Sequence, residues 1–489
     1  MRPASSDPSG ELLAARCARR WLALALAVLV VAGLFALAVV LGRMPPFDRF
    51  VRDPLFFKRC LVVHVNLALV AWFYSFAAAL LFALPGGRPG WLARHSPGLG
   101  GAGVLLMLVA AGLPGTQPLL SNYIPVIDHW LFNAGQLAFG AGVLASLLDR
   151  RLLVRGEATR GFLAIPDAAR PGLRATAAAL LLAALCFGAA WWRVPAGLAP
   201  DARYELLAWG GGHVLQLACT LAMLSAWLIL LESALGRSPV RPRAAALLFA
   251  AMLLPWTLAP LLALQGAWSA SYRTGFTQLM QWAIFPGVLA FLVLCGGALA
   301  RAVRQADAGA RVLADPRISA FVVSGGLTVL GFALGAGIRG SNTMVPAHYH
   351  ASIGGVTVAF MALAYLMLRA FGFAIPTPRL RLAATWQPVV YGVGQMVFAA
   401  GFALAGAYGM SRKAYGAEQA ARGAAETVGL VVMGAGGLVA IAGGLLFIGV
   451  VIAIWRRGFM TRPDMRLVDE AGRYRWTRAI RATSIRSRS

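Results

Sequence analysis

The sequence contains few charged residues for its length. Asp, Glu, Lys and Arg make up 13% of the 489 residues, whereas 59% are hydrophobic and the mean hydropathy is +0.72. Because a soluble domain carries about 25% of charged residues, this shortage predicts a polytopic membrane protein. The net charge of +26 lies mostly in short loops and tails, so we expect contact with membrane lipids and no nucleic-acid partner.

Cysteine is also scarce and lacks the spacing of an attachment site. The chain has no CxxC and no CxxCH, which argues against covalently bound c-type haem and against a zinc knuckle. Most cysteines are expected to be small apolar fillers. They are Cys17, Cys60, Cys186, Cys219 and Cys295. A cleavable signal peptide is not evident, because the first apolar segment is about as long as a full span and is expected to be an anchor.

Long apolar segments dominate the chain. A helix needs about twenty apolar residues to cross the hydrocarbon layer. The predicted spans are residues 21–42, 61–84, 99–119, 127–148, 173–192, 204–234, 244–266, 276–300, 318–338, 348–371, 386–408 and 428–455. We therefore expect an all-α, polytopic bundle of about twelve transmembrane helices at residues 21–455, with tails at 1–20 and 456–489. Prolines interrupt the third and seventh spans: Pro114, Pro118, Pro255 and Pro260.

The basic residues are unevenly shared among the predicted loops. With the N-terminus in the cytoplasm, most of them fall on the inner side, as the positive-inside rule requires. These inner residues include Arg150, Arg151, Arg155, Arg160, Arg301, Arg304, Arg311 and the basic tail 456–489. Both termini are therefore expected to be cytoplasmic, in a bacterial-type inner membrane.

Histidine is rare, yet its positions follow a pattern. The outer half of the predicted spans holds His64, His129, His213, His348 and His350. Only His95 lies in an inner loop. Histidines scattered through a core would show no preference for depth, so we expect one shared site. His348 and His350 point about 200° apart on a helix. This spacing suits two flat haems on opposite faces; two histidines solvated at the interface are the alternative.

The first outer loop breaks the positive-inside rule. Its basic residues are Arg43, Arg49, Arg52, Lys58 and Arg59. A basic cluster here could neutralise haem propionates or dock an acidic partner protein. A chance cluster, partly balanced by Asp48 and Asp53, is an equally good interpretation.

Together these motifs resemble subunit I of the haem–copper oxidase superfamily, over residues 20 to 455. The shared features are twelve spans, a histidine early in the second, another in the sixth, and a His-x-His pair that opens the tenth. The histidine spacing is most similar to the C-type (cbb-type) and nitric oxide reductase branch. The resemblance implies two non-covalent haems, expected to be b-type.

The resemblance also implies a role for each histidine of the pattern. His64 and His350 match the two axial ligands of the low-spin haem. His348 matches the single protein ligand of the high-spin haem, and His213 matches the sixth-span ligand of the copper. Arg339 and Arg59 are candidate propionate partners; anchoring at the membrane interface is the other interpretation of Arg339.

The copper site of the family is incomplete in this sequence. Tyr272 and Arg273 stand where the family has an adjacent pair of histidines, and the stretch between His213 and His348 contains no other histidine. A guanidinium stays protonated and has no lone pair for a metal. The redox-active tyrosine of the family is also absent, since its two alternative positions fall on Leu217 and Phe276. We therefore expect no complete copper site.

These features favour a membrane oxidoreductase that passes electrons from a low-spin to a high-spin haem and reduces oxygen or nitric oxide. Its donor would be an outer-side c-type cytochrome or cupredoxin-like subunit. One alternative is a non-catalytic haem protein that lacks copper and binds a gas or transfers single electrons. A secondary transporter is disfavoured by the missing repeat and by the scarcity of carboxylates within spans. The carboxylates that lie near the spans are all close to span ends: Asp128, Glu205, Glu232 and Glu426.

Overall fold

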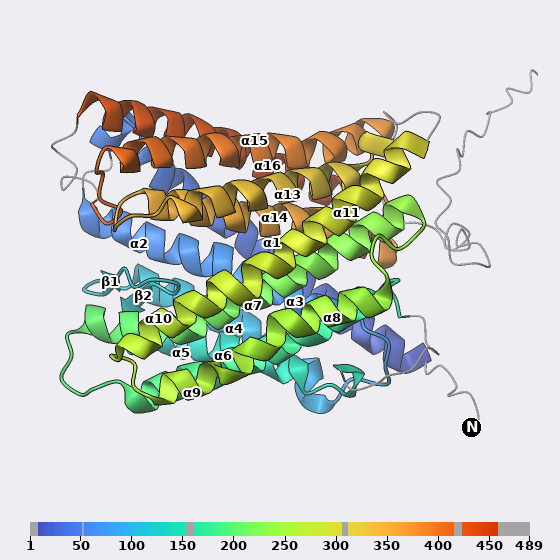
Figure 1. Cartoon of the computed structure of the whole chain (residues 1–489), viewed down its shortest axis with the longest axis horizontal. Coiled ribbons are helices and arrows are strands. Elements are labelled where there is room, and N and C mark those ends of the chain that lie inside the picture. The colour runs from blue at the N-terminus through green and yellow to red at the C-terminus, as the bar shows by residue number, and fades with distance from the viewer. Residues whose placement is uncertain (1–7, 51–52, 153–160, 306–311, 415–422, 458–489) are drawn as a thin grey trace, which may run out of the picture.

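Long helices form one elongated bundle (Figure 1). The computed structural model describes residues 8–50, 53–152, 161–305, 312–414 and 423–457. Within these ranges, twelve helical segments are long and apolar enough to cross a membrane. The predicted number of spans and the all-α class are therefore confirmed, and the chain is a multi-pass membrane protein.

The spans follow one another along the chain as a series of long helices. They are α1 (Pro8–Leu41), α2 with α3 (Pro54–Val65, Trp72–Leu81), α4 (Trp91–Gly112), α5 (Trp130–Leu147), α6 (Arg170–Arg193), α7 (Pro200–Leu235), α8 with α9 (Pro242–Leu253, Ala259–Leu264), α10 with α11 (Ala270–Leu279, Phe285–Gln305), α13 (Pro316–Ala336), α14 (Met344–Ala370), α15 (Pro378–Ala407) and α16 (Ala424–Arg457). Some of the basic residues used to orient the chain lie outside the described residues: Arg52, Arg155, Arg160, Arg311 and the tail after residue 457.

A short hairpin separates the third and fourth spans. β1 (Gln117–Leu119) pairs antiparallel with β2 (Val126–Asp128). The prediction that the third span continues to residue 119 is therefore wrong. Pro114 and Pro118 lack the N–H that a continuing helix needs, and Gly115 has a φ of +76°, which favours glycine. We call the end of the bundle that carries β1 and β2 the hairpin end; it lies at the left in Figure 1.

Three spans contain a turn that departs from α-helical pitch. A π-helical turn, Asn66–Ala71, joins α2 to α3 directly after His64. The seventh span changes to a 3-10 turn at Leu254–Leu258, where the sequence places an interrupting proline. A second π-helical turn, Met280–Ile284, precedes Pro286. Proline cannot donate to the carbonyl four residues earlier, so the hydrogen-bond ladder shifts there.

Helices α7 and α14 form the centre of the bundle. In α7, 83% of the most apolar stretch is buried, and in α14 the value is 72%. Aromatic side chains join α14 to α3: Phe76 stacks on Phe360 with ring centroids 4.5 Å apart, and Phe73 meets Phe360 edge to face. The two helices that carry His213 and the His-x-His pair are therefore the most buried of the described spans.

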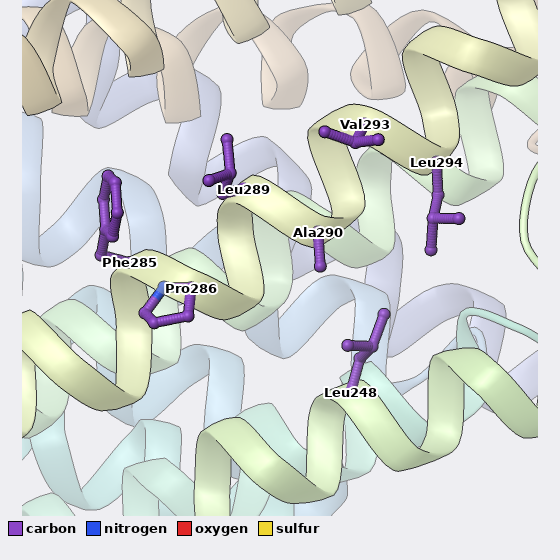
Figure 2. A pocket seen from close by; sticks show the side chains of 7 residues that line it. All are labelled: Leu248, Phe285, Pro286, Leu289, Ala290, Val293 and Leu294. Carbon is purple, nitrogen blue, oxygen red and sulfur yellow. The ribbon is translucent and has the colours of Figure 1, made fainter.

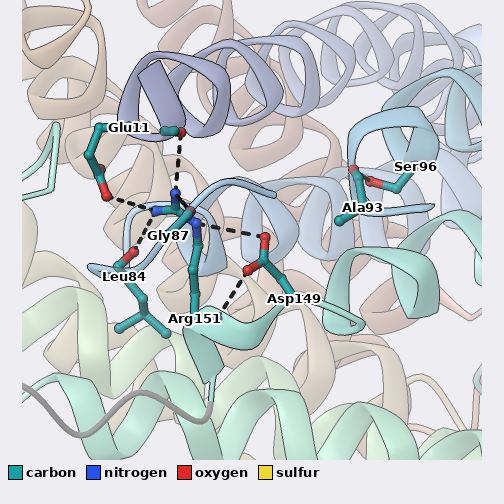
Figure 3. A network of polar contacts seen from close by, with 8 residues as sticks. Glu11, Leu84, Gly87, Ala93, Ser96, Asp149 and Arg151 are labelled. Carbon is teal, nitrogen blue, oxygen red and sulfur yellow. Dashed lines mark hydrogen bonds and ion pairs between the residues drawn. The ribbon is translucent and has the colours of Figure 1, made fainter. Parts of the chain in front are cut away.

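The opposite end of the bundle is held by one buried arginine, shown in Figure 3. Arg151 donates to the backbone carbonyls of Leu84 (3.0 Å), Gly87 and Gly10 (3.3 Å). Its guanidinium also lies 3.3 Å from Glu11 and 3.7 Å from Asp149. The side chain is fully buried, so these contacts offset the cost of removing its charge from water. They tie the start of α1 to the loops that follow α3 and α5.

Figure 2 shows an apolar groove between α8 and α11. Its walls include Leu248 from α8 and Leu289 and Val293 from α11. Of these residues, Val293 is 65% exposed. The groove contains no charged residue and no histidine. It is the kind of surface that lipid chains cover.

Candidate functional site

Three of the histidines predicted to share one site bind a backbone carbonyl through the same ring nitrogen. Nδ1 of His64 lies 3.0 Å from the carbonyl of Ala32, Nδ1 of His213 lies 2.7 Å from that of Trp209, and Nδ1 of His348 lies 2.6 Å from that of Gly331. A carbonyl can only accept, so Nδ1 carries the proton in each ring. The lone pair is then on Nε2, which is the arrangement that metal-ligating histidines use.

His64 and His350 come together from different spans. His64 lies in α2, and its Nδ1 contact fixes it to α1. His350 lies in α14, with its ring centroid 4.5 Å from that of Phe398 and 6.3 Å from that of Phe402 in α15. The imidazoles of His64 and His350 are close enough to interact electrostatically. The structure therefore gathers the two residues matched to the low-spin haem, although nearly three hundred residues separate them in sequence.

His348 faces a different neighbour from His350. Its ring contacts α13, where Gly331 supplies the carbonyl and Gly335 makes room for the ring. A Cβ on Gly335 would lie 2.8 Å from Nδ1 of His348, which is closer than real contacts allow. The His-x-His pair thus directs one imidazole toward α13 and the other toward α15, as helical geometry requires for positions two apart.

A buried arginine stands beside His350. Arg43 follows α1 and is only 3% exposed. Its Nη2 donates to the carbonyl of Arg412 at 2.8 Å, and its guanidinium carbon lies 5.2 Å from the ring centroid of Phe402. Arg43 also interacts electrostatically with His350. Sequence reasoning placed Arg43 in the basic outer loop without distinguishing it from its neighbours; its position directly after the first span was the available signal.

The two arginines proposed as propionate partners are engaged elsewhere. Arg59 donates to the carbonyls of Leu113 (3.1 Å) and Thr116 (2.5 Å), so it fastens the entry to the hairpin. Arg339 is exposed and donates to the carbonyls of Ala336 (2.9 Å) and Ile338 (3.2 Å) in its own turn. Neither contact tests the propionate role, which stays a prediction for both residues.

The remaining two histidines have local roles. His129 is the N-cap of α5, where its Nδ1 accepts from the backbone N–H of Leu131 at 3.2 Å. His95 lies in α4 with its Nδ1 2.8 Å from the carbonyl of Trp91. The depth of His129 in the bundle, which sequence reasoning counted toward one shared site, therefore has a structural explanation of its own.

His213 differs from the other histidines because both of its ring nitrogens are engaged. Its Nε2 lies 2.7 Å from the hydroxyl of Tyr123, which comes from the loop between β1 and β2. Burial raises the pKa of Tyr123 above its ordinary value, and the Glu205 carboxylate raises it further. The phenol is therefore protonated and donates to Nε2. Sequence reasoning missed Tyr123, since nothing in the chain marks a contact across ninety positions.

The loop holds Tyr123 in a strained conformation. Tyr123 has a φ of +66°, and the N–H of Ile124 donates to the carbonyl of Asn122 at 2.8 Å, which closes a γ-turn. A residue other than glycine in this region costs about 1–3 kcal/mol. Glu205 of α7 keeps the turn in place, because it accepts from the backbone N–H of Asn122 at 2.8 Å and from its side-chain amide.

Tyr272 and Arg273 do not point at His213 as ligands would. The Tyr272 hydroxyl donates to the carbonyl of Leu206 and accepts from the N–H of Gly210, both at 2.9 Å. The guanidinium of Arg273 lies 5.8 Å from the ring centroid of Trp209. Aromatic rings fill the surroundings of His213: Tyr123, Trp209 and Phe276 have centroids within 5.8 Å of it.

The residues present fit haem but do not fit copper. His64 and His348 offer a free Nε2, and the His350 ring makes no hydrogen bond to another described residue. Neutral imidazoles of this kind are the usual haem ligands. By contrast, the described residues contain no group of three or more His, Cys, Asp or Glu that could hold a metal ion. A three-ligand copper site is therefore not formed by that part of the chain.

Two uncharacterized proteins are similar to this chain in sequence. No family model matches the sequence. An uncharacterized protein of Aquifex aeolicus (strain VF5) is 30% identical over 356 residues, which is 72% of this chain and 85% of that protein. The uncharacterized protein RP382 of Rickettsia prowazekii (strain Madrid E) is 24% identical over 464 residues, 81% of this chain and 88% of that protein.

A solved structure is similar over most of the length. It comes from a cryo-EM study of a heme-copper terminal oxidase dimer, with a TM-score of 0.71 and coverage of 92% of this chain and 84% of that chain. The sequences are only 15% identical, so this likeness shows the fold and leaves the chemistry to the residues of this chain.

Proposed function

Because this chain belongs to one family with the Aquifex aeolicus protein and has the fold of a heme-copper terminal oxidase chain, we propose that it is a membrane haem oxidoreductase. The observation that carries the proposal is the divergence of the His-x-His pair. His350 packs on Phe398 of α15 and interacts electrostatically with His64, whereas His348 is fixed to α13. Two separate haems are the ligands that this arrangement suits.

The histidines would divide the work between two irons. Haem supplies one-electron redox chemistry when it is bound. His64 and His350 would together hold one haem, which would restrict that haem to electron transfer. His348 would alone hold the other haem, which would then be able to bind a gas. We propose two b-type haems, with oxygen or nitric oxide as the acceptor.

Charged residues at the hairpin end would complete the low-spin haem site. Arg43 is buried beside His350, and its guanidinium is held by the carbonyl of Arg412. A haem propionate is an anion, and a guanidinium beside the haem ligand would bind it with charge-assisted hydrogen bonds. Arg59 and Arg339 stay secondary candidates for the same role.

The membrane setting of the protein is also proposed. The hairpin end would face outward in a bacterial-type inner membrane, with both termini in the cytoplasm. The N-terminal end of α1 and the C-terminal end of α16 would then lie on the inner side. Electrons would arrive from an outer-side c-type cytochrome or cupredoxin-like subunit.

An absorption spectrum of the purified protein tests the proposal. We expect a Soret band, the alpha band of a low-spin b-type haem, and a change on adding carbon monoxide to the reduced protein. Pyridine haemochrome analysis should give two haems per chain. A purified, folded protein without a Soret band would exclude the haem function and return the secondary transporter to consideration.

A second function follows from the Tyr123–His213 contact. If His213 holds no copper, the chain can be a haem protein that binds a gas or transfers single electrons without turnover. Steady-state consumption of oxygen and nitric oxide, with an artificial reductant, separates the two. Turnover well above that of the heat-denatured protein supports the oxidoreductase, whereas reduction and gas binding without turnover support the second function.

A further inference from the structure

We infer that the phenol of Tyr123 takes the place of the copper ion at His213. This inference rests on the proposed function, because it concerns the position that the resemblance assigns to copper. In this role Tyr123 is a positioning residue: its hydroxyl occupies Nε2 of His213, the nitrogen that would otherwise bind a metal. The high-spin haem would then have no metal partner.

The hydrogen bonds leave the His213 ring no free coordination position. A neutral imidazole has one donor and one acceptor nitrogen. Nδ1–H donates to Trp209, and Nε2 accepts from the Tyr123 hydroxyl. A copper ion could bind Nε2 only if the phenol moved away. His213 is also only 2% exposed, so a displaced phenol would have to find another hydrogen-bond partner in a buried region.

The chain is shaped to bring Tyr123 to this nitrogen. The three residues before His213 are glycines, Gly210 to Gly212. A Cβ on Gly212 would lie 2.4 Å from the Cβ of Tyr123, so only glycine lets the hairpin loop approach α7 this closely. On the other side, Glu205 binds Asn122 and holds the γ-turn against the same helix. The small size of Gly212 and the Glu205–Asn122 hydrogen bond therefore both help to place Tyr123 beside His213.

The charges around the pair also disfavour a metal ion. The Arg273 guanidinium lies over the Trp209 ring, which itself packs against His213. Arg412 interacts electrostatically with Tyr123. The nearby carboxylate, Glu205, is committed to Asn122. A copper cation would add charge to a region that already has two guanidinium groups, whereas a neutral phenol adds none.

Copper retention tests the inference without requiring turnover. The purified wild-type protein would be incubated with cuprous ion under anaerobic reducing conditions, desalted and analysed for copper. We expect well below one copper per chain, and the same for Tyr272→Phe, the matched control whose hydroxyl bonds only to backbone. Stoichiometric copper in the wild type that disappears in His213→Ala would overturn the inference.

A gain-of-binding variant makes the test sharper. Histidine is shorter than tyrosine, so Tyr123→His would leave space beside Nε2 of His213 for a metal with bonds of about 2.0–2.1 Å. We expect severalfold more retained copper than in the wild type, and loss of the gain in the double variant with His213→Ala. A folded Tyr123→His protein that retains no more copper than Tyr272→Phe would contradict the inference that the Tyr123 phenol occupies the place of a copper ion.

The carbon monoxide complex provides an independent measurement. Infrared spectra of the reduced, carbon monoxide-bound protein report the surroundings of a gas on the high-spin haem. Tyr123→Phe should shift the carbon monoxide stretching frequency, because it frees the His213 ring, whereas Tyr272→Phe should not. An unchanged frequency in Tyr123→Phe would refute the inference alone. Failure of every form to bind carbon monoxide would instead refute the proposed haem function.

Discussion

Two regions at the hairpin end treat their histidines in opposite ways. His64 and His348 each fix one nitrogen on a backbone carbonyl and leave the other available. His213 makes the same backbone contact, but Tyr123 occupies its second nitrogen. The comparison teaches that a buried histidine whose Nδ1 is bound to a backbone carbonyl is not by itself evidence for a metal. The hydrogen-bond partner of Nε2 decides whether the ring is a ligand.

The largest expected effect concerns the proposed haem ligands. His64→Ala and His350→Ala should each abolish the low-spin absorption bands and leave the carbon monoxide change, because a missing axial imidazole cannot be replaced within the span. His348→Ala should do the reverse. His95→Ala is the control, since His95 contacts only its own helix, and it should leave both signals. Retention of both signals in all three site variants would show that these histidines do not bind haem.

Arg43 provides a graded test of the same region. Arg43→Ala removes a buried cation next to His350. A positive charge favours the reduced haem, so its loss should lower the midpoint potential of the low-spin haem by tens of millivolts. Arg59→Ala is the matched control, because Arg59 is bound to the hairpin entry. A redox titration that shows an equal or larger shift for Arg59→Ala would assign the propionate role to Arg59 instead.

Gly212→Ala tests how closely the hairpin loop must approach α7. The added Cβ would overlap the Tyr123 side chain, so overpacking should destabilise the protein by about 1–3 kcal/mol. Gly188→Ala, at a helical position with nothing within 4 Å, should be neutral or slightly stabilising. Thermal inactivation in detergent measures both. Equal stability of the two variants would show that the loop moves away without cost.

The smallest effect is expected at Glu205. Glu205→Gln keeps one oxygen acceptor but removes the charge that strengthens its bond to the N–H of Asn122. We expect a loss of about 1 kcal/mol. Glu426→Gln is the control, since Glu426 accepts from the backbone N–H of Gly423 at the start of α16 and has no contact with the Tyr123 turn among the described residues. A shift in the thermal midpoint that is no greater for Glu205→Gln than for this control would show that the turn is held by other contacts.

Much of the fold follows from hydrophobic length alone. The twelve spans and the presence of His-x-His at the start of the tenth depend on local sequence, and the structure has both. The boundaries are less local. The sequence places residues 117–119 in a helix, but Pro114, Gly115 and Pro118 divert them into β1. Helix α1 begins at Pro8, before the predicted start of the first span at residue 21.

The site is only partly readable from the sequence, because its contacts are long-range. The positions of His64, His213, His348 and His350 can be predicted from spacing and depth. The contact of Tyr123 with His213 cannot be predicted in this way, because it depends on the β1–β2 hairpin, which no motif in the sequence indicates. The glycines before His213 indicate a close approach but not what approaches. The burial of Arg43 is similarly hidden, because Arg412 is 369 positions away.

The most direct test of the comparison is iron and copper quantitation on the purified protein. If the free nitrogens of His64, His348 and His350 hold haem and that of His213 is closed by Tyr123, iron should be present at about two per chain and copper well below one. Iron near zero would contradict the haem assignment, and copper at one per chain would contradict the closed His213.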